Sequence, residues 1–588
     1  IAPLMAAHWA AIGTNTRLFA RVDALFEIRE RLALSPEQAR LLERTRTSFV
    51  RSGATLDEAS SVRLMAIVSR LATLGTRFSQ NVLADEANWD MPLDGQGDLA
   101  GLPDSLVAAT RAAAETRGKP GHVVTLARSI VEPFLVFSEA RELRQRAFEA
   151  WIRRGEMGGD TDNRAIVAEM VQLRIERAKL LGYPNFASYK LDDTMAKTPA
   201  AVRGLLDTVW APAVARCAEE RAALGALAAA EGGPATIAPW DWRHYAQKVR
   251  RRDYAIDETE VKAYFPLDHM IEAAFDTANR LFGVSFRERN DVPVYHPDVR
   301  VWEVIGPGGA HVGLFLGDYH ARPSKRSGAW MSAFRSQEKL RRDKRPIIVN
   351  VMNFAKAPDG QPTLLSFDDA RTLFHEFGHG LHGLLSNVTY PSMAGTAVAR
   401  DFVELPSQLY EHWLSTPDVL TRHARHHATG APIPAALVEK LEAARHFNQG
   451  FATVEYCASA YVDLAFHELD DATDLDPTAF EAAVLARVGM PEGMVMRHRT
   501  PHFAHVFAGD GYSAGYYSYL WSEVMDADAF AAFEETGDVF AKPVAARLLE
   551  HVYSAGNRAD PAAAYVAFRG RMPDVGPLLR KRGFPAAA

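Results

Sequence analysis

The sequence predicts a mainly α-helical protein with one small antiparallel β-sheet. Apolar residues recur at helical spacing from residue 1 to about residue 285, and the pattern returns at Ser366 and continues almost to the C-terminus. Strand-like runs gather instead between about residues 293 and 370. At 588 residues the chain is too long for one small core, so we expect two or more domains or one large helical assembly.

The N-terminal half is predicted to contain helices whose buried faces and first turns are both marked in the sequence. Capping-box patterns begin at Ser35, which is followed by Pro36 and Gln38, and at Thr55, which is followed by Glu58. We expect a helix to start at each of them. One helix face is predicted to carry four apolar residues spaced i, i+4, i+7 and i+11: Ile67, Leu71, Leu74 and Phe78.

Three runs rich in β-branched and aromatic residues predict the sheet, and they span residues 292–306, 311–319 and 345–354. The sequence Gly-Pro-Gly-Gly at residues 306–309 separates the first two runs and is typical of a turn. We therefore expect antiparallel strands just ahead of the helical pattern that begins at Ser366.

The composition is that of an ordinary globular protein, with 48% hydrophobic residues, 24% charged residues and a net charge of -7. Because the chain has no polybasic block and no apolar run near the roughly 20 residues of a membrane helix, we expect neither nucleic acid nor a membrane as a partner. Cys217 and Cys457 cannot form a disulfide framework, which favours a reducing compartment. We expect a cytoplasmic protein that works as a monomer. The chain begins at Ile1 and lacks the basic start and cleavage site of a secretory signal, and we expect that an N-terminal portion has been lost.

Residues 371–383 read RTLFHEFGHGLHG and contain the pattern His-Glu-x-x-His. On a helix, His375 and His379 leave the same face roughly 6 Å apart, which suits two ligands of one tetrahedral zinc ion. Glu376 lies beside the first histidine, where its carboxylate can reach a metal-bound water without occupying the metal, as a general base must. The alternative is a helix that contains these letters by chance, because the chain has 20 histidines.

A hydrolytic zinc site leaves one position open for water and needs a third protein ligand. His382 lies a further turn along the helix, so we expect it to be structural. The better candidate is Glu404, and Asp401 three residues earlier lies on the same side, where it can accept the second N–H of a ligand histidine. Glu411 is the rival carboxylate, and a solvated helix face is the alternative for Asp401 and Glu404. We expect one Zn²⁺ per chain.

Amide hydrolysis also needs hydrogen-bond donors aimed at the developing oxyanion. Phenols are neutral donors at pH 7, and glycines let a loop bring them close to a substrate. Residues 502–521 combine a Gly-rich turn with His505 and with four tyrosines, which are Tyr512, Tyr516, Tyr517 and Tyr519. An aromatic helix packed in a core is the alternative, although two glycine-centred breaks count against it.

These residues stand in longer motifs that resemble one family, the zinc peptidases that include thimet oligopeptidase, oligopeptidase A and bacterial peptidyl-dipeptidase. The matching segments are FLGDYHARPSKRSGAWM, NVMNF, LLSFDDARTLFHEFGH, HEFGHGLHG, AGTAVARDFVELPSQLYEHW and FAGDGYSAGYYSYLWSEVMDADAF. The likeness is strongest from about residue 141 to the end. We therefore divide the chain into an N-terminal helical region, 1–140, truncated at its start, and a metallopeptidase catalytic region, 141–588.

The resemblance implies a mostly helical fold in which two lobes flank a deep, narrow channel with zinc on its floor. By the matching motifs, the resemblance implies that His375, His379 and Glu404 bind zinc and that Glu376 is the catalytic base. It also implies that Tyr512 and Tyr519 stabilise the oxyanion. His505 and Tyr516 would line the substrate site, and we count His505 as catalytic.

The motifs are most similar to those of the peptidyl-dipeptidase branch, which releases dipeptides from the C-termini of oligopeptides. Such an enzyme must bind a free carboxylate, most naturally with Arg or Lys. The cations within the motifs are Arg400, Arg322, Lys325 and Arg326; we assign Arg400 to substrate binding and leave the carboxylate ligand open. We also expect an edge of the sheet that contains residues 349–354 to pair with extended substrate.

Three other functions remain open from the sequence. Within the same chemistry, the chain could be an endo-oligopeptidase of the thimet type. From a different class, it could be a non-catalytic peptide-binding protein, although Glu376 is needed for hydrolysis and not for binding zinc. A purely structural zinc site would require four closed protein ligands, and the sequence offers three good ones and His382.

Overall fold

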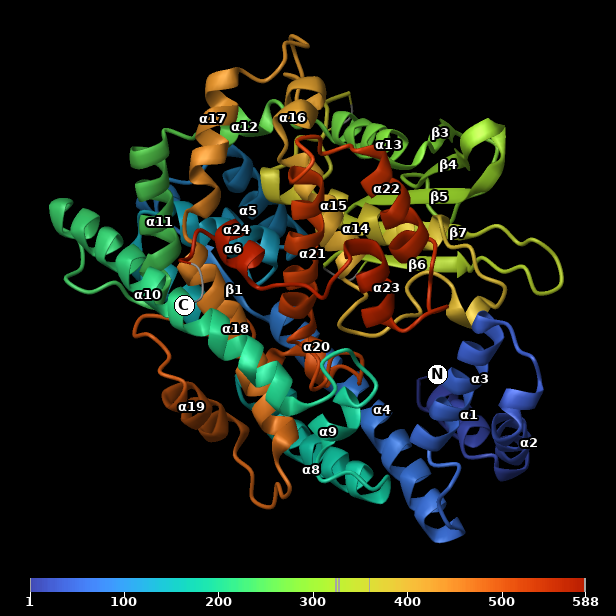
Figure 1. Ribbon diagram of the computed structural model, residues 1–588. Helices are drawn as coiled ribbons and strands as arrows, with labels where there is room; N and C mark the ends of the chain where they lie inside the picture. Colours follow the sequence, from blue (N-terminus) through green and yellow to red (C-terminus); the bar gives the residue numbers. More distant parts are fainter. Residues whose placement is uncertain (1, 323–324, 326–327, 359, 586–588) are drawn as a thin grey trace.

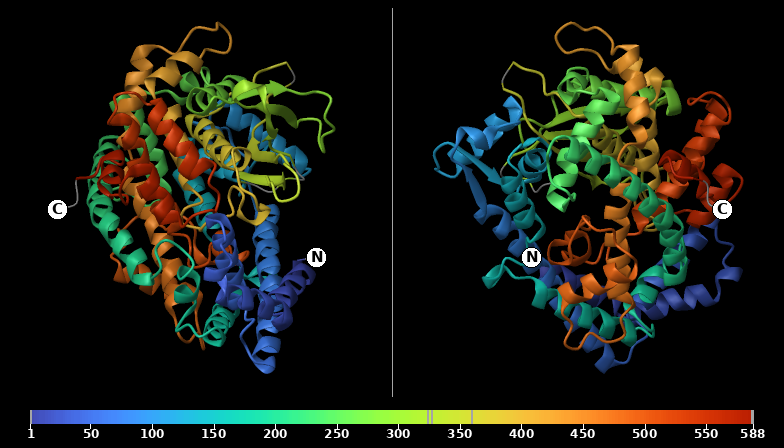
Figure 2. Two further views of the ribbon diagram at one scale, coloured as in Figure 1. Left: turned by 45° about the vertical axis from the view of Figure 1, so that its right-hand side comes forward. Right: turned by 90° about the vertical axis from the view of Figure 1, so that its left-hand side faces the viewer.

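The computed structural model describes residues 2–322, 325, 328–358 and 360–585, and this part of the chain is mainly helical, as predicted (Figure 1). Helices α1 to α4 lie at the lower end in Figure 1 and in the left view of Figure 2, and a five-stranded sheet lies above them. No helix of the described residues is long and apolar enough to cross a membrane. The four N-terminal helices are α1 (Ala2–Gly13), α2 (Thr16–Glu27), α3 (Pro36–Arg51) and α4 (Glu58–Asn88).

A first hydrophobic core, formed by long helices from both halves of the chain, buries the predicted apolar face of α4. Ile67 and Phe78 are both 0% exposed, and Leu71 and Leu74 lie in the same core, which confirms the helical spacing. The other helices of this core are α8 (Arg164–Leu180), α9 (Phe186–Leu191), α10 (Pro199–Ala230), α11 (Pro239–Tyr254), α18 (Gln449–Glu468), α19 (Pro477–Arg487), α20 (Ala504–Phe507) and α24 (Gly576–Lys581).

A second hydrophobic core lies between the five-stranded sheet and a group of helices from the later half of the chain. Its helices are α12 (Glu258–Lys262), α13 (Leu267–Phe282), α14 (Phe367–Leu384), α15 (Leu405–Leu414), α16 (Pro417–His423), α17 (Ala435–Ala443), α22 (Lys542–Leu548) and α23 (Pro561–Arg569). Helix α21 (Ser518–Glu534) contributes residues to both cores. The two cores support an arrangement of two lobes; the channel between them stays a prediction.

The sheet is mixed, which corrects the prediction of a purely antiparallel one. Its strand order is β3-β4-β5-β7-β6, and every neighbouring pair is antiparallel except β5 and β7, which run parallel. The reason is β6, a strand that the sequence did not predict: it pairs with β7 as a hairpin, so β7 returns in the direction of β5. The bounds are β3 (Ser285–Glu288), β4 (Arg300–Ile305), β5 (His311–His320), β6 (Trp330–Arg335) and β7 (Ile347–Phe354).

Of the two predicted capping boxes, one is confirmed and one is wrong. At the start of α3 the Ser35 amide donates to Gln38 Oε1 at 2.9 Å, and the Gln38 amide donates to Ser35 Oγ at 3.3 Å. Helix α4 instead begins after Asp57, whose carboxylate accepts from the Ser60 amide at 2.8 Å. Aspartate is itself a strong N-cap, so Asp57 takes the position that the pattern gave to Thr55.

A third, smaller core packs around a two-stranded antiparallel sheet and contains residues from both sides of residue 140. The division of the chain at that residue therefore stays a prediction. The elements of this core are β1 (Asp90–Leu93), α5 (Asp104–Thr116), β2 (His122–Thr125), α6 (Arg128–Phe137) and α7 (Arg141–Ile152).

Helices α14 and α15 approach each other closely at Gly378. A Cβ atom placed there would lie 2.7 Å from the carbonyl oxygen of Pro406 and 2.7 Å from Ser407 Cα, both backbone atoms that cannot rotate away. We expect Gly378→Ala to force the two helices apart and lower the free energy of unfolding by about 1–3 kcal/mol, as overpacking does. Urea denaturation measures the loss. Gly380→Ala is the matched control, because its Cβ would meet its nearest atom at 3.4 Å; equal stability of the two variants would contradict the prediction.

Candidate metal centre and active site

The start of α14 sets the register of the His-Glu-x-x-His residues. Ser366 and Asp369 form a capping box, in which the Asp369 amide donates to Ser366 Oγ at 3.0 Å and the Ser366 amide donates to Asp369 Oδ2 at 3.0 Å. From this start the helix places His375 and His379 on one face, with ring centroids 5.0 Å apart. The four-residue spacing of the two histidines therefore places both imidazoles on one helix face, as the sequence predicted.

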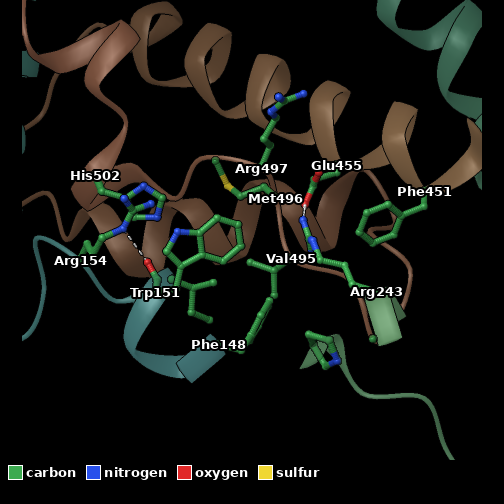
Figure 3. Close-up of a pocket in the computed structure, with 13 residues that line it drawn as sticks. Phe148, Trp151, Arg154, Arg243, Phe451, Glu455, Val495, Met496, Arg497 and His502 are labelled. Atoms are coloured by element: carbon green, nitrogen blue, oxygen red, sulfur yellow. Dashed lines mark hydrogen bonds and ion pairs between the residues drawn. The ribbon is translucent and has the colours of Figure 1, made fainter. Parts of the chain in front are cut away.

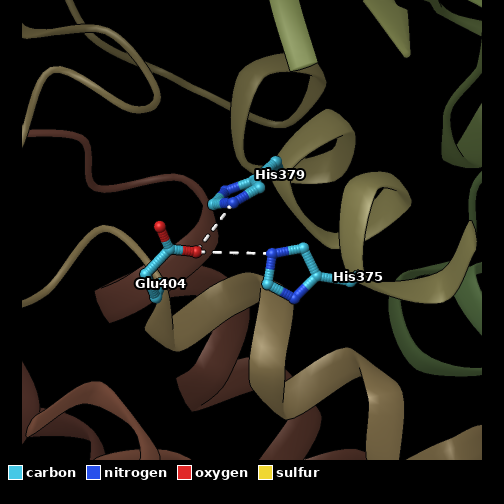
Figure 4. Close-up of side chains that lie close together, drawn as sticks. All are labelled: His375, His379 and Glu404. Atoms are coloured by element: carbon cyan, nitrogen blue, oxygen red, sulfur yellow. Dashed lines mark hydrogen bonds and ion pairs between the residues drawn. The ribbon is translucent and has the colours of Figure 1, made fainter. Parts of the chain in front are cut away.

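Glu404 brings a carboxylate to the two histidines from the first residue of a neighbouring element. It is the N-cap of α15, and Pro406 lies in the first turn, where a helix tolerates proline. Glu404 Oε2 lies 3.0 Å from His379 Nε2 and 3.4 Å from His375 Nε2 (Figure 4). One ligand atom from each of the three residues lies within 4.8 Å of the others, so the structure brings the three predicted metal ligands together.

The charges around this group fit a divalent cation. Burial would raise the pKa of Glu404, but the two histidines hold it well below its usual value. Burial would lower the pKa of His375, but its hydrogen bonds to Glu404 and Glu411 hold it well above the usual value. With Glu376 beside them, three carboxylates surround two imidazoles in a mostly buried space. Buried carboxylates need compensating charge, and two imidazole nitrogens with a carboxylate oxygen are a known ligand set for divalent metals.

The partner of His375 is Glu411 rather than Asp401, which corrects the predicted role of Asp401. His375 Nδ1 donates to Glu411 Oε1 at 2.6 Å, so its Nε2 is left to face Glu404. Asp401 lies in the turn before α15, and its carboxylate accepts hydrogen bonds from the amides of Met195 and Ala196, each at 2.9 Å. The prediction failed because it assumed that Asp401 and Glu404 share one helix face.

We expect Glu411→Ala to weaken metal binding about 10- to 100-fold, because the loss of a carboxylate behind a ligand histidine releases its ring. Competition with a chelator, using Zn²⁺ as the probe, measures the affinity. Glu439→Ala is the control, since Glu439 is exposed on α17. Unchanged affinity in Glu411→Ala would show that His375 needs no support from this carboxylate.

Glu376 is placed as a general base requires. It projects from α14 between the two histidines in sequence, is 6% exposed, and its Oε2 has no hydrogen-bond partner among the described residues. Burial raises its pKa above the usual value. A buried carboxylate with an unused oxygen and a raised pKa can take a proton from a nearby water and give it up again.

Residues 502–521 bring their aromatic side chains to the same centre. Tyr512 Oη donates to Glu404 Oε1 at 2.7 Å. The rings of Tyr512 and Tyr519 are stacked, with centroids 5.3 Å apart and planes 5° apart. Burial, followed by the charge of Glu404, raises the pKa of both phenols, so they stay protonated donors at neutral pH.

His505 and Tyr516 lie behind the tyrosine pair. The His505 ring is 5.7 Å from that of Tyr512 and 5.3 Å from that of Tyr516, and burial lowers the pKa of His505 to about 4. The backbone amide of Tyr516 donates to Asp463 Oδ2 at 2.9 Å and so ties this loop to α18. The alternative of one packed aromatic helix fails, because α21 begins only at Ser518.

The predicted cations separate into two groups. The Arg400 guanidinium lies over the Tyr512 ring, with Cζ 4.6 Å from the centroid, and is therefore close to the candidate metal ligands. Arg322 and Lys325 instead pair with the buried Asp318 of β5, at 2.7 and 2.9 Å. Arg326 lies outside the described residues.

Two other residues of α14 lie near the candidate metal centre without belonging to its ligands. His382 is 0% exposed and lies outside the group of candidate ligands, as predicted, with its ring 6.4 Å from that of Tyr553. Sequence reasoning missed Arg371, whose Nε lies 3.9 Å from Glu411 Oε2. Its position one turn before His375 was the signal that could have found it.

The comparisons with known proteins agree with this chemistry. The model of peptidase family M3 matches residues 134–584. The chain belongs to this family. It is 41% identical over 574 residues to the dipeptidyl carboxypeptidase of Salmonella typhimurium, covering 97% of this chain and 84% of that one. It is 32% identical over 593 residues to oligopeptidase A of Escherichia coli, covering 99% and 86%.

Among solved structures, the fold is similar to that of PZ peptidase A with an inhibitor, with a TM-score of 0.56 and 14% identity over 98% of this chain and 85% of that one. Membership of peptidase family M3 makes the protein a metallopeptidase, a hydrolase that requires a divalent metal. The family resemblance drawn from the motifs is therefore confirmed.

Proposed function

We propose that this family M3 member is a zinc peptidase that releases dipeptides from the C-termini of oligopeptides, with one Zn²⁺ per chain. The observation that carries the hydrolytic part is the group of His375, His379 and Glu404 beside a buried Glu376, whose Oε2 has no hydrogen-bond partner among the described residues. The relative at 41% identity, a dipeptidyl carboxypeptidase, supports dipeptide release.

We assign a residue of the site to each step of peptide hydrolysis. A zinc ion held by His375, His379 and Glu404 would acidify the attacking water and polarise the scissile carbonyl. Glu376 takes a proton from the water as its oxygen attacks the carbonyl carbon, and later gives this proton to the nitrogen of the leaving amine. Tyr519 donates a hydrogen bond to the oxyanion, and Tyr512 does so when its hydroxyl turns away from Glu404 Oε1.

The substrate is proposed to lie against residues on both sides of this centre. His505 and Tyr516 line its site, and Arg400 contacts it near Tyr512. Strand β7, which contains residues 349–354, is bonded on both sides and cannot itself pair with a peptide; β6 ends the strand order on that side and is the edge to which extended substrate pairs. Esters in place of substrate amides near the cleaved bond then weaken turnover, and full turnover of such esters would contradict the pairing.

An endo-oligopeptidase is the second candidate, favoured by the 32% identity to oligopeptidase A. A binding protein without activity is less well supported, because binding alone gives no reason to bury Glu376 beside the histidines. We further propose that the protein works as a monomer in the cytoplasm, where its buried and unpaired Cys217 and Cys457 stay reduced.

Mass spectrometry of the products separates these functions. A nonapeptide with a free C-terminus and its C-terminally amidated twin are each incubated with Zn²⁺-loaded protein and with chelator-treated protein. Stepwise loss of dipeptides from the free peptide alone is the expected result, and chelation should stop it. Internal cleavage of both peptides would favour the endo-oligopeptidase, and no cleavage by the zinc-loaded protein would leave only a binding role.

A further inference from the structure

Three consecutive side chains, Arg497, His498 and Arg499, lie beside the tyrosine segment on a firmly held backbone. The amide of Arg497 donates to the Glu455 carbonyl at 2.9 Å, and that of His498 donates to Ser459 Oγ at 3.1 Å, so both residues are fixed to α18. Arg499 is nearly buried, and its Nε pairs with Glu481 Oε1 at 2.7 Å. Two of the three side chains thus have evident structural roles: Arg499 in this ion pair, and His498 in its packing on Phe503, with centroids 5.2 Å apart.

Arg497 differs from its neighbours. Its side chain is exposed and makes no hydrogen bond or ion pair within the part of the chain that the structure describes. Glu455, the nearby acid, is engaged by Arg243 Nη2 at 2.7 Å (Figure 3). Figure 3 shows the Arg497 side chain pointing away from Phe148 and Val495, which line a small cavity of about 20 Å³ below it. A fixed backbone therefore presents a cation that has no partner among the described residues.

The position of Arg497 relates it to the candidate active site. The ring of the adjacent His498 lies 5.7 Å from that of Tyr516 and 5.2 Å from that of His505. After burial, the positive charge of Arg497 is the next largest cause of the lowered pKa of His505. Arg497 is thus the neighbour in sequence of a residue whose ring packs on His505 and Tyr516, the side chains beside the tyrosine pair.

Because the substrate carboxylate must lie away from the candidate metal ligands, the structure favours Arg497 over Arg400 as its ligand. Arg400 lies on Tyr512, whose hydroxyl contacts Glu404, so a carboxylate bound to it would sit directly at the candidate metal centre. Two extended residues span about 7 Å, so the terminal carboxylate of a departing dipeptide must be bound at a distance from the scissile bond. Arg322 and Lys325 are already engaged in ion pairs with Asp318.

We propose that Arg497 binds the C-terminal carboxylate of the substrate and so fixes the released product at two residues. This inference rests on the proposed function of dipeptide release. A guanidinium can bind a carboxylate through two parallel hydrogen bonds, and a free acid is the one group that a substrate end offers and an internal peptide segment does not.

The test is the ratio of kcat/KM for a peptide with a free C-terminus to kcat/KM for its amide, measured for wild type, Arg497→Gln, Arg497→Lys and Arg400→Gln. We expect Arg497→Gln to lower kcat/KM for the free acid about 10- to 100-fold, the range for hydrogen bonds to charged groups, and to leave the amide nearly unchanged. Arg497→Lys should keep part of the preference, because it retains the charge without the paired donors. The exposed Arg487 at the end of α19 provides the control Arg487→Gln.

The outcomes separate this inference from the function on which it rests. If wild type shows no preference for the free acid, the proposed dipeptide release fails. If wild type has the preference and folded, metal-loaded Arg497→Gln keeps it, the inference about Arg497 is overturned and the function stands. Collapse of the ratio in Arg400→Gln alone would move the carboxylate to Arg400. Should Arg497→Gln fail to fold, Arg497→Lys decides: a ratio equal to wild type would count against the paired hydrogen bonds and overturn the inference.

Discussion

Replacing Glu376 by Gln is expected to lower kcat by about two to four orders of magnitude, the range that general acid–base catalysis supplies. Glutamine has nearly the shape of glutamate but cannot take a proton from water or return it to the leaving amine. Because the Glu376 carboxylate has an oxygen without a hydrogen-bond partner among the described residues, its replacement disturbs little else. Hydrolysis of a fluorogenic oligopeptide under saturating substrate measures kcat.

The control for this variant is its metal content and its affinity for an uncleaved peptide, both of which should equal those of wild type. Glu376 is not among the three residues whose ligand atoms meet. If Glu376→Gln lost the metal as well, the loss of activity would say nothing about a base. If it kept the metal and retained more than about a tenth of wild-type kcat, another group would have to accept the proton.

Replacing Tyr519 by Phe is expected to lower kcat about 10²- to 10³-fold with little change in KM, which is the usual effect of removing one oxyanion donor. The phenol acts only as charge develops on the carbonyl oxygen, so substrate binding should be nearly unaffected. Burial keeps the Tyr519 hydroxyl protonated at neutral pH, and its ring is held by stacking on Tyr512. Initial rates over a range of substrate concentrations separate kcat from KM.

Tyr512→Phe is the informative comparison for Tyr519→Phe. The Tyr512 hydroxyl donates to Glu404 at 2.7 Å, so Tyr512→Phe should lose metal affinity as well as kcat. A rise in KM without a fall in kcat for Tyr519→Phe would mean that the phenol holds the substrate and not the transition state.

The parts of the site that the sequence predicted correctly depend on local geometry. His375 and His379 share a face because a helix repeats about every 3.6 residues, and Ser366 with Asp369 fixes where that helix starts. The fold class was predictable for the same reason, since the apolar face of α4 follows the helical repeat.

The errors arose where contacts between distant segments decide the structure. Asp401 was placed by counting residues on a helix that begins only after Glu404, and its true partners, the amides of Met195 and Ala196, lie some 200 positions earlier. The direction of β7 depends on β6, a strand with a partly exposed and irregular pattern. The isolation of Arg497 likewise depends on Arg243, which engages Glu455 in its place.

The order of the site residues along the chain has a consequence for synthesis. Protein synthesis proceeds from the N-terminus, so His375, His379 and Glu404 leave the ribosome more than 100 residues before Tyr512 and Tyr519. Tyr517, which donates to Asp401 at 2.8 Å, also belongs to the later segment. An unfinished chain can therefore hold the candidate metal ligands while it lacks the donors for the oxyanion. The nascent protein therefore lacks the proposed oxyanion donors until this later segment has joined the metal ligands.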